Sequence, residues 1–281
     1  MKIKISSDST CDLSQELIER YNVGIVPLTV FMDGQSFHDG VDITPLDIFA
    51  SVAKSGVLPK TSAISVFEYE TFFAEQLKTY DCVIHYCISS KASACYDNAC
   101  AAAKGFGNKV RVIDSYALST GQGLLVLKAC DLLAEGKSPD EIVNTTKSLI
   151  NNVNTSFVPD SLEYLHKGGR CSLASMIGAK LLKLHPLIGM KDGQMFAERK
   201  LSGSMEKCFK KYITELSEVY TSYDKTRCFI THSYCAPELV KAVKEQVEEL
   251  FDFDEILETC AGSTITAHCG QNTLGLLFIF N

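Results

Sequence analysis

The sequence predicts an α/β protein of two domains, and three observations lead to this fold class. Short apolar runs typical of buried parallel strands, such as Val83–Ile88, alternate with helical patterns through the first half of the chain. The polar cluster at 151–154 ends this alternation. Beyond it, Asp192-Gly193 between two apolar runs is typical of a two-residue β-hairpin. We therefore expect an N-terminal domain, residues 1–154, with a mainly parallel sheet flanked by helices, and a C-terminal α/β domain, residues 155–281, with a partly antiparallel sheet.

The first elements follow from local signals. Residues 2–7 alternate between polar and apolar side chains as a strand does, and Ser14 is placed to cap the helix that follows. Residues 23–31 predict a second strand, with Pro27 favouring an edge position. Capping boxes predict helices after Thr44 and after Ser65, and residues 59–63 between these helices are expected to form a loop.

The stretch 83–103 reads as strand, turn and helix, and its turn carries Ser89, Ser90 and Ser93. In open α/β sheets, ligands sit at the carboxyl ends of strands, where helix N-termini offer free N–H groups to an acidic group. These serines are therefore candidates for the rim of an anion pocket. Plain helix capping by serine is the alternative.

A strand at 110–114 and a loop at 115–123 come next. Gly121 and Gly123 in that loop would let the backbone approach another group closely, either a ligand or a packed strand. Helices are then expected at about 124–135 and from Ser138 onward.

The second half contains strand patterns at 155–158, 228–231, 255–260 and 274–280, and helical patterns after Ser172, around 208–216 and at 237–250. Between the halves, Gly168-Gly169-Arg170 would present a cation beside backbone N–H groups, which suits an anion. A solvated arginine on an interdomain loop is the alternative.

Composition excludes several classes of function. The net charge is −7 with both signs interleaved, so no basic stripe is available for nucleic acid or an anionic membrane. No apolar run is long enough to span a bilayer and no signal-peptide pattern opens the chain, so we expect a cytoplasmic protein without stable membrane insertion. The 12 cysteines are therefore expected as thiols. His232 with Cys235, joined by His268 and Cys269, is a conceivable zinc set, but its spacing predicts no metal site.

An ordered set of blocks covers nearly the whole chain: Asp8–Leu13, Pro59–Ser62, Ile88–Ser93, Val112–Ser115, Gly121–Leu124, Leu162–Arg170 and Gly262–His268. In this order the blocks resemble the DegV family of bacterial fatty-acid-binding proteins, which includes the binding subunit of fatty acid kinase. The resemblance implies a two-domain α/β protein that buries an acyl chain in an apolar tunnel. It implies no cofactor other than the bound fatty acid.

The resemblance also implies roles for individual residues. Thr61 and Ser93 match the hydroxyls that hold the carboxyl group, while Arg170 and His268 match the rim associated with kinase docking and phosphoryl transfer. Other candidate ligand-binding residues are Ser62, Ser89, Ser90, Gly121 and, again, His268. The loop Cys269–Asn272 departs from the family pattern, which has Pro and a second Gly there, and this bears on phosphoryl transfer more than on lipid binding.

The expected function is to present the carboxyl group of a long-chain fatty acid to a separate ATP-dependent kinase, giving acyl phosphate for phospholipid synthesis. The chain carries no Walker motif and no kinase glycine-rich loop, so we expect no catalysis by this chain alone. Three alternatives stay open: a serine-based acyl hydrolase or transferase, a fatty-acid sensor without kinase coupling, and a zinc-binding regulator.

Overall fold

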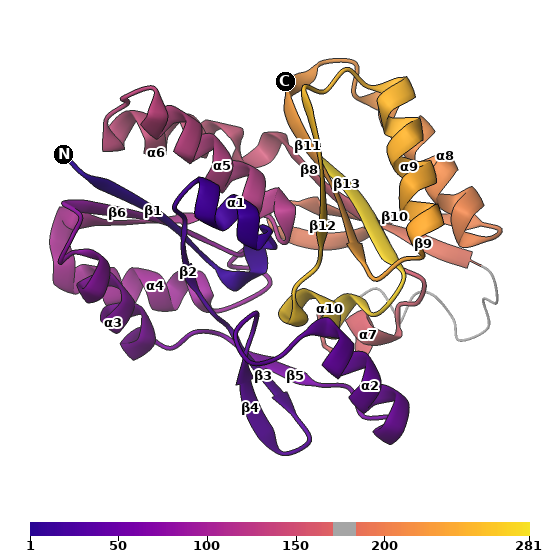
Figure 1. Ribbon diagram of the computed structural model, residues 1–281, viewed down its shortest axis with the longest axis horizontal. Coiled ribbons are helices and arrows are strands. Elements are labelled where there is room, and N and C mark those ends of the chain that lie inside the picture. Colours follow the sequence, from indigo (N-terminus) through magenta and orange to yellow (C-terminus); the bar gives the residue numbers. More distant parts are fainter. Residues whose placement is uncertain (171–183) are drawn as a thin grey trace.

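A computed structural model of the protein describes residues 1–170 and 184–281 (Figure 1). It has a parallel sheet in the N-terminal part and a mixed sheet in the C-terminal part, which confirms the predicted fold class. The helix predicted after Ser172 lies outside the described residues. The last sheet of the chain begins with a strand at Val153, and the division into domains 1–154 and 155–281 stays a prediction.

The first sheet has four parallel strands in the order β2-β1-β6-β7. Its strands are β1 (Ile3–Asp8), β2 (Gly24–Val26), β6 (Cys82–Cys87) and β7 (Val110–Asp114). The helices of this part are α1 (Gln15–Arg20), α3 (Val66–Gln76), α4 (Cys95–Ala103), α5 (Thr120–Ala134) and α6 (Pro139–Leu149). Figure 1 shows α3 and α4 on one face of the sheet and α5 and α6 on the other. Because both faces are covered, β1 and β6 are buried along their whole length.

The second sheet has six strands in the order β10-β9-β8-β13-β11-β12. These strands are β8 (Val153–Val158), β9 (Leu184–Lys191), β10 (Gln194–Ser202), β11 (Tyr223–Ser233), β12 (Glu255–Cys260) and β13 (Thr273–Phe280). Only β11 and β12 pair in parallel, so the sheet is mixed as predicted. Its outer face is covered by α8 (Met205–Val219) and α9 (Pro237–Leu250) (Figure 1). The predicted hairpin is confirmed, with Asp192 and Gly193 both at positive φ.

The predicted single strand at 23–31 is wrong, because the chain breaks at Pro27 and its two parts join different sheets. The second part, β3 (Thr29–Met32), is the centre of a small antiparallel sheet with β4 (Gln35–His38) and β5 (Lys60–Ser62). The loop predicted at 59–63 is therefore a strand. Proline offers no N–H for a ladder, so Pro27 was a local sign of the break, whereas the strand that pairs with β5 is distant in sequence and no local signal marked β5.

Helix starts were predicted more accurately, because their determinants are local. The helix α2 (Pro45–Ser55) has a complete capping box in which Thr44 and Asp47 exchange hydrogen bonds. The same reciprocal bonds open α3 at Ser65 and α6 at Ser138. Each box satisfies N–H groups that would otherwise have no partner in the first turn.

The helix α5 lies between the two sheets and contacts strands of both. Its sequence is apolar around most of its circumference, as expected for a helix buried on all sides. The loop predicted at 115–123 is wrong at its end, because α5 already begins at Thr120. Gly121 thus lies in the first helical turn, where a Cβ would stand 2.2 Å from Oγ1 of Thr155, and a Cβ on Gly123 would stand 2.8 Å from the carbonyl oxygen of Cys11. Both glycines serve close packing of α5.

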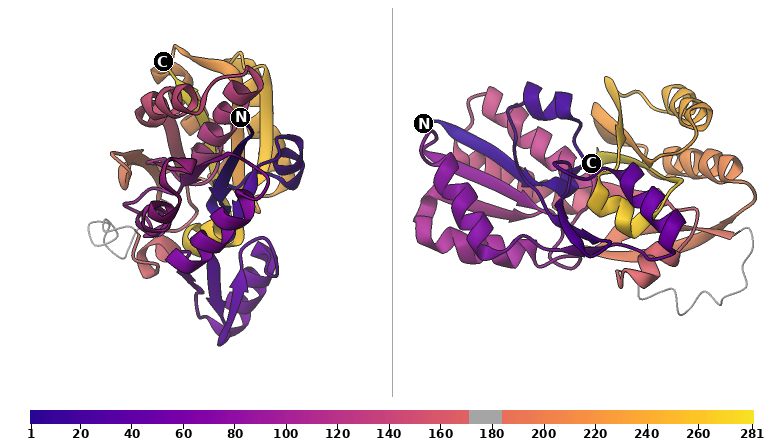
Figure 2. Two further views of the ribbon diagram at one scale, coloured as in Figure 1. Left: turned by 90° about the vertical axis from the view of Figure 1, so that its left-hand side faces the viewer. Right: turned by 60° about the horizontal axis from the view of Figure 1, so that its bottom comes forward.

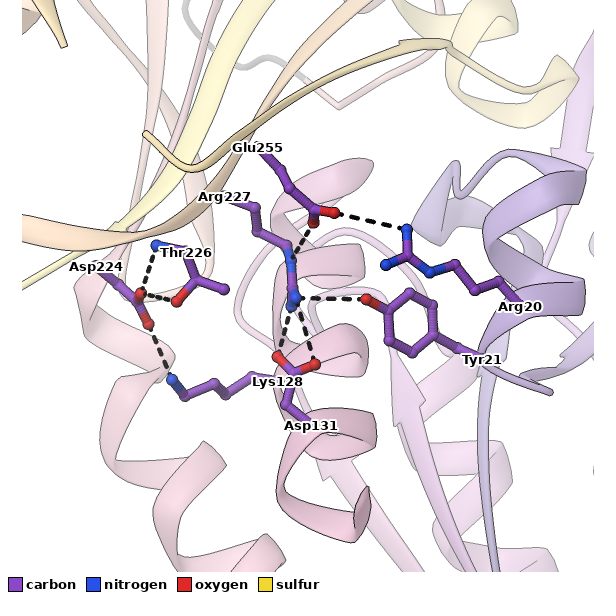
Figure 3. A network of polar contacts seen from close by, with 8 residues as sticks. All are labelled: Arg20, Tyr21, Lys128, Asp131, Asp224, Thr226, Arg227 and Glu255. Carbon is purple, nitrogen blue, oxygen red and sulfur yellow. Dashed lines mark hydrogen bonds and ion pairs between the residues drawn. The ribbon is translucent and has the colours of Figure 1, made fainter. Parts of the chain in front are cut away.

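A cluster of charges also joins the two sheets (Figure 3). Arg227 of β11 is buried and donates to Asp131 of α5 over 2.6 and 3.3 Å, and it reaches the Tyr21 hydroxyl at 3.4 Å. Glu255 lies 3.5 Å from both Arg227 and Arg20. A neighbouring ion pair, Lys128 with Asp224, spans 2.9 Å. Each charge in this cluster therefore has a partner of opposite sign.

Two short helices, α7 (Glu163–Lys167) and α10 (Ser263–Cys269), lie beside the small sheet and α2. Figures 1 and 2 show this group at one end of the molecule, below the two large sheets in the view of Figure 1. Within residues 1–170 and 184–281, the helices are too short or too polar for one to cross a lipid bilayer.

Candidate functional site

A narrow cavity lies where β5, the turn after β6, α7, β10 and α10 meet. Its polar lining residues are Thr61, Ser62, Ser93, Arg170, Thr264 and His268. The rest of its wall is apolar: Leu28, Ala63, Ile88, Ala92, Leu118, Leu165, Met195, Ile265 and Cys269. The structure therefore brings five of the predicted site residues into one cavity, although they come from separate parts of the chain.

The centre of the polar wall is a hydrogen bond of 2.7 Å between Thr61 Oγ1 and His268 Nε2. Burial, with a smaller contribution from the Arg170 charge, lowers the pKa of His268 to about 4. The imidazole is therefore neutral at pH 7. If its proton is on Nε2, His268 donates to Thr61, and the threonine hydroxyl is then free to donate to a ligand oxygen.

The Thr61–His268 pair resembles a nucleophile and its base, but two features weaken that interpretation. A pKa of about 4 makes His268 a poor base at neutral pH. Its Nδ1 is buried without a hydrogen-bond partner, so no carboxylate orients the ring as the acid of a triad would. None of the cavity serines bonds to a histidine within the described residues. The geometry favours holding a ligand over a serine-based hydrolase.

Ser93 and Arg170 lie at the mouth of the cavity, because both also line an open polar groove beside it. The Ser93 hydroxyl oxygen accepts from the N–H of Cys95 at 3.3 Å and thereby forms the turn that leads into α4. Arg170 is exposed, and its side chain donates to the carbonyl of Gly168 at 2.8 Å. Of the two residues predicted to support phosphoryl transfer, only Arg170 thus carries a charge at pH 7.

Three predicted ligand-binding residues lie outside this cavity. Ser89 is buried, and its hydroxyl donates to the carbonyl of Gly193 at 2.6 Å, which fastens the β9–β10 turn. Ser90 lines the open groove with Ser93 and Arg170. Gly121 packs against Thr155 as described above.

The position of α10 is fixed by two buried carboxylates from the N-terminal part. Asp12 accepts from the N–H of Gly262 at 2.9 Å, and Asp39 accepts from the N–H of Ser263 at 2.7 Å. Carboxylates stabilise helix N-termini through such bonds and through the helix dipole. Burial nevertheless raises the pKa of Asp12 well above its usual value. The Asp8–Leu13 block thus positions a helix that lines the cavity.

A second narrow cavity lies between α10, the start of α5 and the second sheet. Phe157, Gly275 and Leu277 of the sheet form part of its wall. It shares three lining residues with the first cavity, which are Leu118, Ile265 and Cys269. We call these three residues the waist, because they stand between the two cavities.

Sequence reasoning missed the waist and Thr264. The helical spacing of Thr264 and His268, and of Ile265 and Cys269, could have placed each pair on one face of a short helix. Nothing in the sequence, however, indicated that Leu118 would face them. His232 and Cys235 do not join His268 and Cys269, and no group of three potential metal ligands occurs in the described ranges. The 11 cysteines within these ranges are free thiols.

The family model described as an uncharacterised protein of the DegV family matches residues 2–281. The chain belongs to the DegV family. A DegV domain-containing protein of Caldanaerobacter subterraneus is 31% identical over 278 residues, which is 99% of this chain and 98% of that protein. A DegV domain-containing protein of Clostridium acetobutylicum is 30% identical, with 99% and 98% covered.

Solved DegV structures have the same fold. A DegV family protein of Thermus thermophilus, which is described as binding fatty acid, superposes with a TM-score of 0.90 at 31% identity over 100% of both chains. DegV of Bacillus subtilis, described as a fatty acid binding protein, gives 0.86 at 25% over 100% of both. A stearic acid-binding protein of Eubacterium ventriosum gives 0.84 at 27%, covering 99% of this chain and 98% of that one.

Proposed function

We propose that this protein binds one long-chain fatty acid in the cytoplasm, with its carboxyl group at Thr61 and Ser93 and its chain running past the waist into the second cavity. The observation that carries this proposal is the arrangement of the two cavities. They share the three apolar residues of the waist, and the first cavity brings Thr61, Ser93 and His268 together beside the open groove, while the second continues between α10 and the second sheet. The fatty acids bound by DegV proteins of the same fold support the same ligand class.

Energetics indicate why an apolar channel suits this ligand. Burying about 16 carbons at ~0.8 kcal/mol per CH₂ gives roughly 12 kcal/mol of transfer free energy. Association costs of about 4–15 kcal/mol offset much of this gain. The chain must therefore supply most of the affinity, and the carboxyl group needs orientation more than attraction. Neutral hydroxyls provide orientation without locking both oxygens in a bidentate arginine pair.

The carboxyl group would then be presented to a separate ATP-dependent kinase. A carboxylate oxygen held by Thr61 and Ser93 at the mouth is free to attack a phosphoryl group from the groove side. Charge spreads over the oxygens of the transferred group, and a nearby cation stabilises it. Arg170 supplies this cation, while neutral His268 holds Thr61 in place. A fatty-acid sensor without a kinase would have the same binding site and no phosphorylated product.

Native mass spectrometry of the purified protein tests binding directly. We expect the mass of the chain plus one fatty acid, and recovery of that mass when delipidated protein is given palmitate. Protein that purifies free of lipid and takes up none would refute the proposal. Incubation of the loaded protein with ATP and a fatty acid kinase catalytic subunit separates the carrier, which yields acyl phosphate, from the sensor, which does not.

Head-group contacts are tested by Thr61→Val and Ser93→Ala. Each substitution removes a hydroxyl worth about 1 kcal/mol, so the Kd for palmitate should rise about fivefold in isothermal titration calorimetry. Thr71→Val is a matched control, because Thr71 is exposed on α3 and its hydroxyl bonds only to its own helix. Equal affinities for wild type and Thr61→Val would contradict this placement of the carboxyl group.

A further inference from the structure

Thr264 is a polar residue of the cavity with an unusual property. Thr264 is only 3% exposed, it lines the first cavity, and its Oγ1 has no hydrogen-bond partner. An unpaired buried hydroxyl is costly, so a native structure that keeps one calls for an explanation. A plain core position would be filled better by valine, which has the same shape.

The place of Thr264 in α10 explains why the helix itself does not satisfy the hydroxyl. Threonine inside a helix commonly bonds to the carbonyl four residues earlier, as Thr71 of α3 does with the carbonyl of Phe67 at 2.9 Å. Thr264 is the second residue of α10, so no helical carbonyl lies behind it. Its hydroxyl can therefore pair only with something outside the helix.

The neighbours of Thr264 indicate what that group is. His268 lies four residues on, so the two side chains stand on the same face of α10, one turn apart. His268 holds Thr61 at 2.7 Å, and Thr61, Ser93 and Thr264 all line the same wall. The neutral imidazole brings no charge of its own to this wall. An acceptor with two oxygens placed against it could take hydrogen bonds from more than one of these hydroxyls.

We propose that Thr264 is a further ligand-binding residue, whose hydroxyl donates a hydrogen bond to a carboxyl oxygen of the bound fatty acid. This inference rests on the proposed function and adds a contact to it. The lipid-free protein keeps an unpaired hydroxyl, and the ligand satisfies it. Thr264 therefore contributes to affinity at a cost to the stability of the lipid-free protein.

Thr155 offers a matched control. It is also a threonine with 3% exposure and an unpartnered Oγ1, but it packs against Gly121 and is not among the residues that line either cavity. Thr264→Val and Thr155→Val thus make the same chemical change in the same degree of burial. They differ in whether the hydroxyl can meet the ligand.

The experiment uses delipidated full-length protein and palmitate labelled with ¹³C at the carboxyl carbon. We expect Thr264→Val to raise the Kd for palmitate about fivefold and to shift the carboxyl ¹³C resonance. The lipid-free variant should be at least as resistant to urea as wild type. Thr155→Val should match wild type in both Kd and resonance, and Thr264→Ser, which keeps the hydroxyl, should restore binding to within about twofold.

Two results would overturn the inference alone. One is a Thr264→Val protein that binds palmitate with wild-type affinity and an unshifted resonance. The other is a lipid-free Thr264→Val protein of reduced stability, because the hydroxyl then has a partner within the protein. If wild type itself takes up no palmitate, the proposed function fails together with the inference, so the two failures are distinguishable.

Discussion

Two junctions connect the halves of the molecule, and they differ in how completely their polar groups are paired. In the Arg227 cluster, each charged side chain has an oppositely charged neighbour (Figure 3). At the α10 cavity, Thr264 Oγ1 and His268 Nδ1 are buried without partners. Arg227 Nε also lacks a hydrogen bond, but Glu255 lies 3.5 Å from it, so the first junction is balanced in charge, whereas the α10 cavity holds neutral polar groups without partners.

This difference separates polar groups that stabilise the fold from polar groups that are available to a ligand. Paired charges between α5 and β11 stabilise the relative position of the sheets and leave nothing for a ligand to satisfy. Unpaired groups on α10 cost stability, and such groups persist where a ligand supplies the missing partner. The comparison predicts that substitutions in the Arg227 cluster change stability and leave lipid affinity intact, whereas removal of a cavity hydroxyl weakens lipid binding.

The largest effect is expected from Arg227→Met, which breaks the paired junction. Asp131 would lose its partner in a half-buried site, and we expect the free energy of unfolding to fall by about 3 kcal/mol. Urea denaturation measures this loss, with palmitate affinity unchanged at temperatures where the variant is folded. Lys210→Met is the control, because it breaks only an exposed ion pair with Glu206 and should leave the stability close to that of wild type. An Arg227→Met protein with normal stability and weakened lipid binding would show that the Arg227 cluster serves binding and not stability.

An effect of intermediate size is expected on the free energy of unfolding, to which His268 makes a contribution that depends on pH. His268 has a pKa of about 4 in the folded protein and 6.5 as its ordinary value. Between these pH values, the unfolded chain takes up a proton that the folded protein does not, so His268 lowers stability as the pH falls. The slope is about 1.4 kcal/mol per pH unit. The His268→Asn variant lacks this contribution. The difference between its free energy of unfolding and that of wild type should therefore be smaller at pH 4.5 than at pH 7.

Thr61→Val is the control for this pH series. It removes the same hydrogen bond without removing a titratable group, so its destabilisation should be equal at the two pH values. Urea titrations of the three proteins at pH 7 and pH 4.5 give the comparison. A His268→Asn difference that does not change with pH would mean that His268 is not kept neutral by burial.

The smallest effect on binding is expected from Arg170→Ala. Arg170 is exposed, and its side-chain hydrogen bond within residues 1–170 and 184–281 goes to the carbonyl of Gly168, so the Kd for palmitate should change less than about twofold. Phosphorylation of the bound fatty acid by a kinase should fall at least about tenfold, because the cation at the mouth is lost. Lys104→Ala should change neither quantity, because Lys104 is an exposed cation just after the end of α4 and lines neither the cavity nor the groove. Equal losses of binding and phosphorylation would contradict the separate roles of Thr61 and Arg170.

Features set by neighbouring residues were predictable from the sequence. The capping boxes at Thr44 and Ser65 and the hairpin at Asp192-Gly193 follow from interactions within a few residues, and all three are present. Ser93 and Arg170 were candidates from local patterns, but the shared carboxyl site of Thr61, Ser93 and His268 could be named only through the family resemblance, because these residues lie far apart in the chain. Their convergence on one cavity depends on β5 pairing with β3 and on Asp12 and Asp39 holding α10.

By itself, the sequence determined the α/β class and the starts of the helices with capping boxes, α2 and α3, and its resemblance to a family indicated a fatty acid. The tertiary structure alone decided that residues 23–31 divide between two sheets, that Gly121 serves packing, and that Leu118 meets Ile265 and Cys269 at the waist. It also decided which hydroxyls have no partner. The physical reason is that hydrogen-bond satisfaction and cavity walls depend on contacts between residues distant in sequence, and local periodicity carries no information about those contacts.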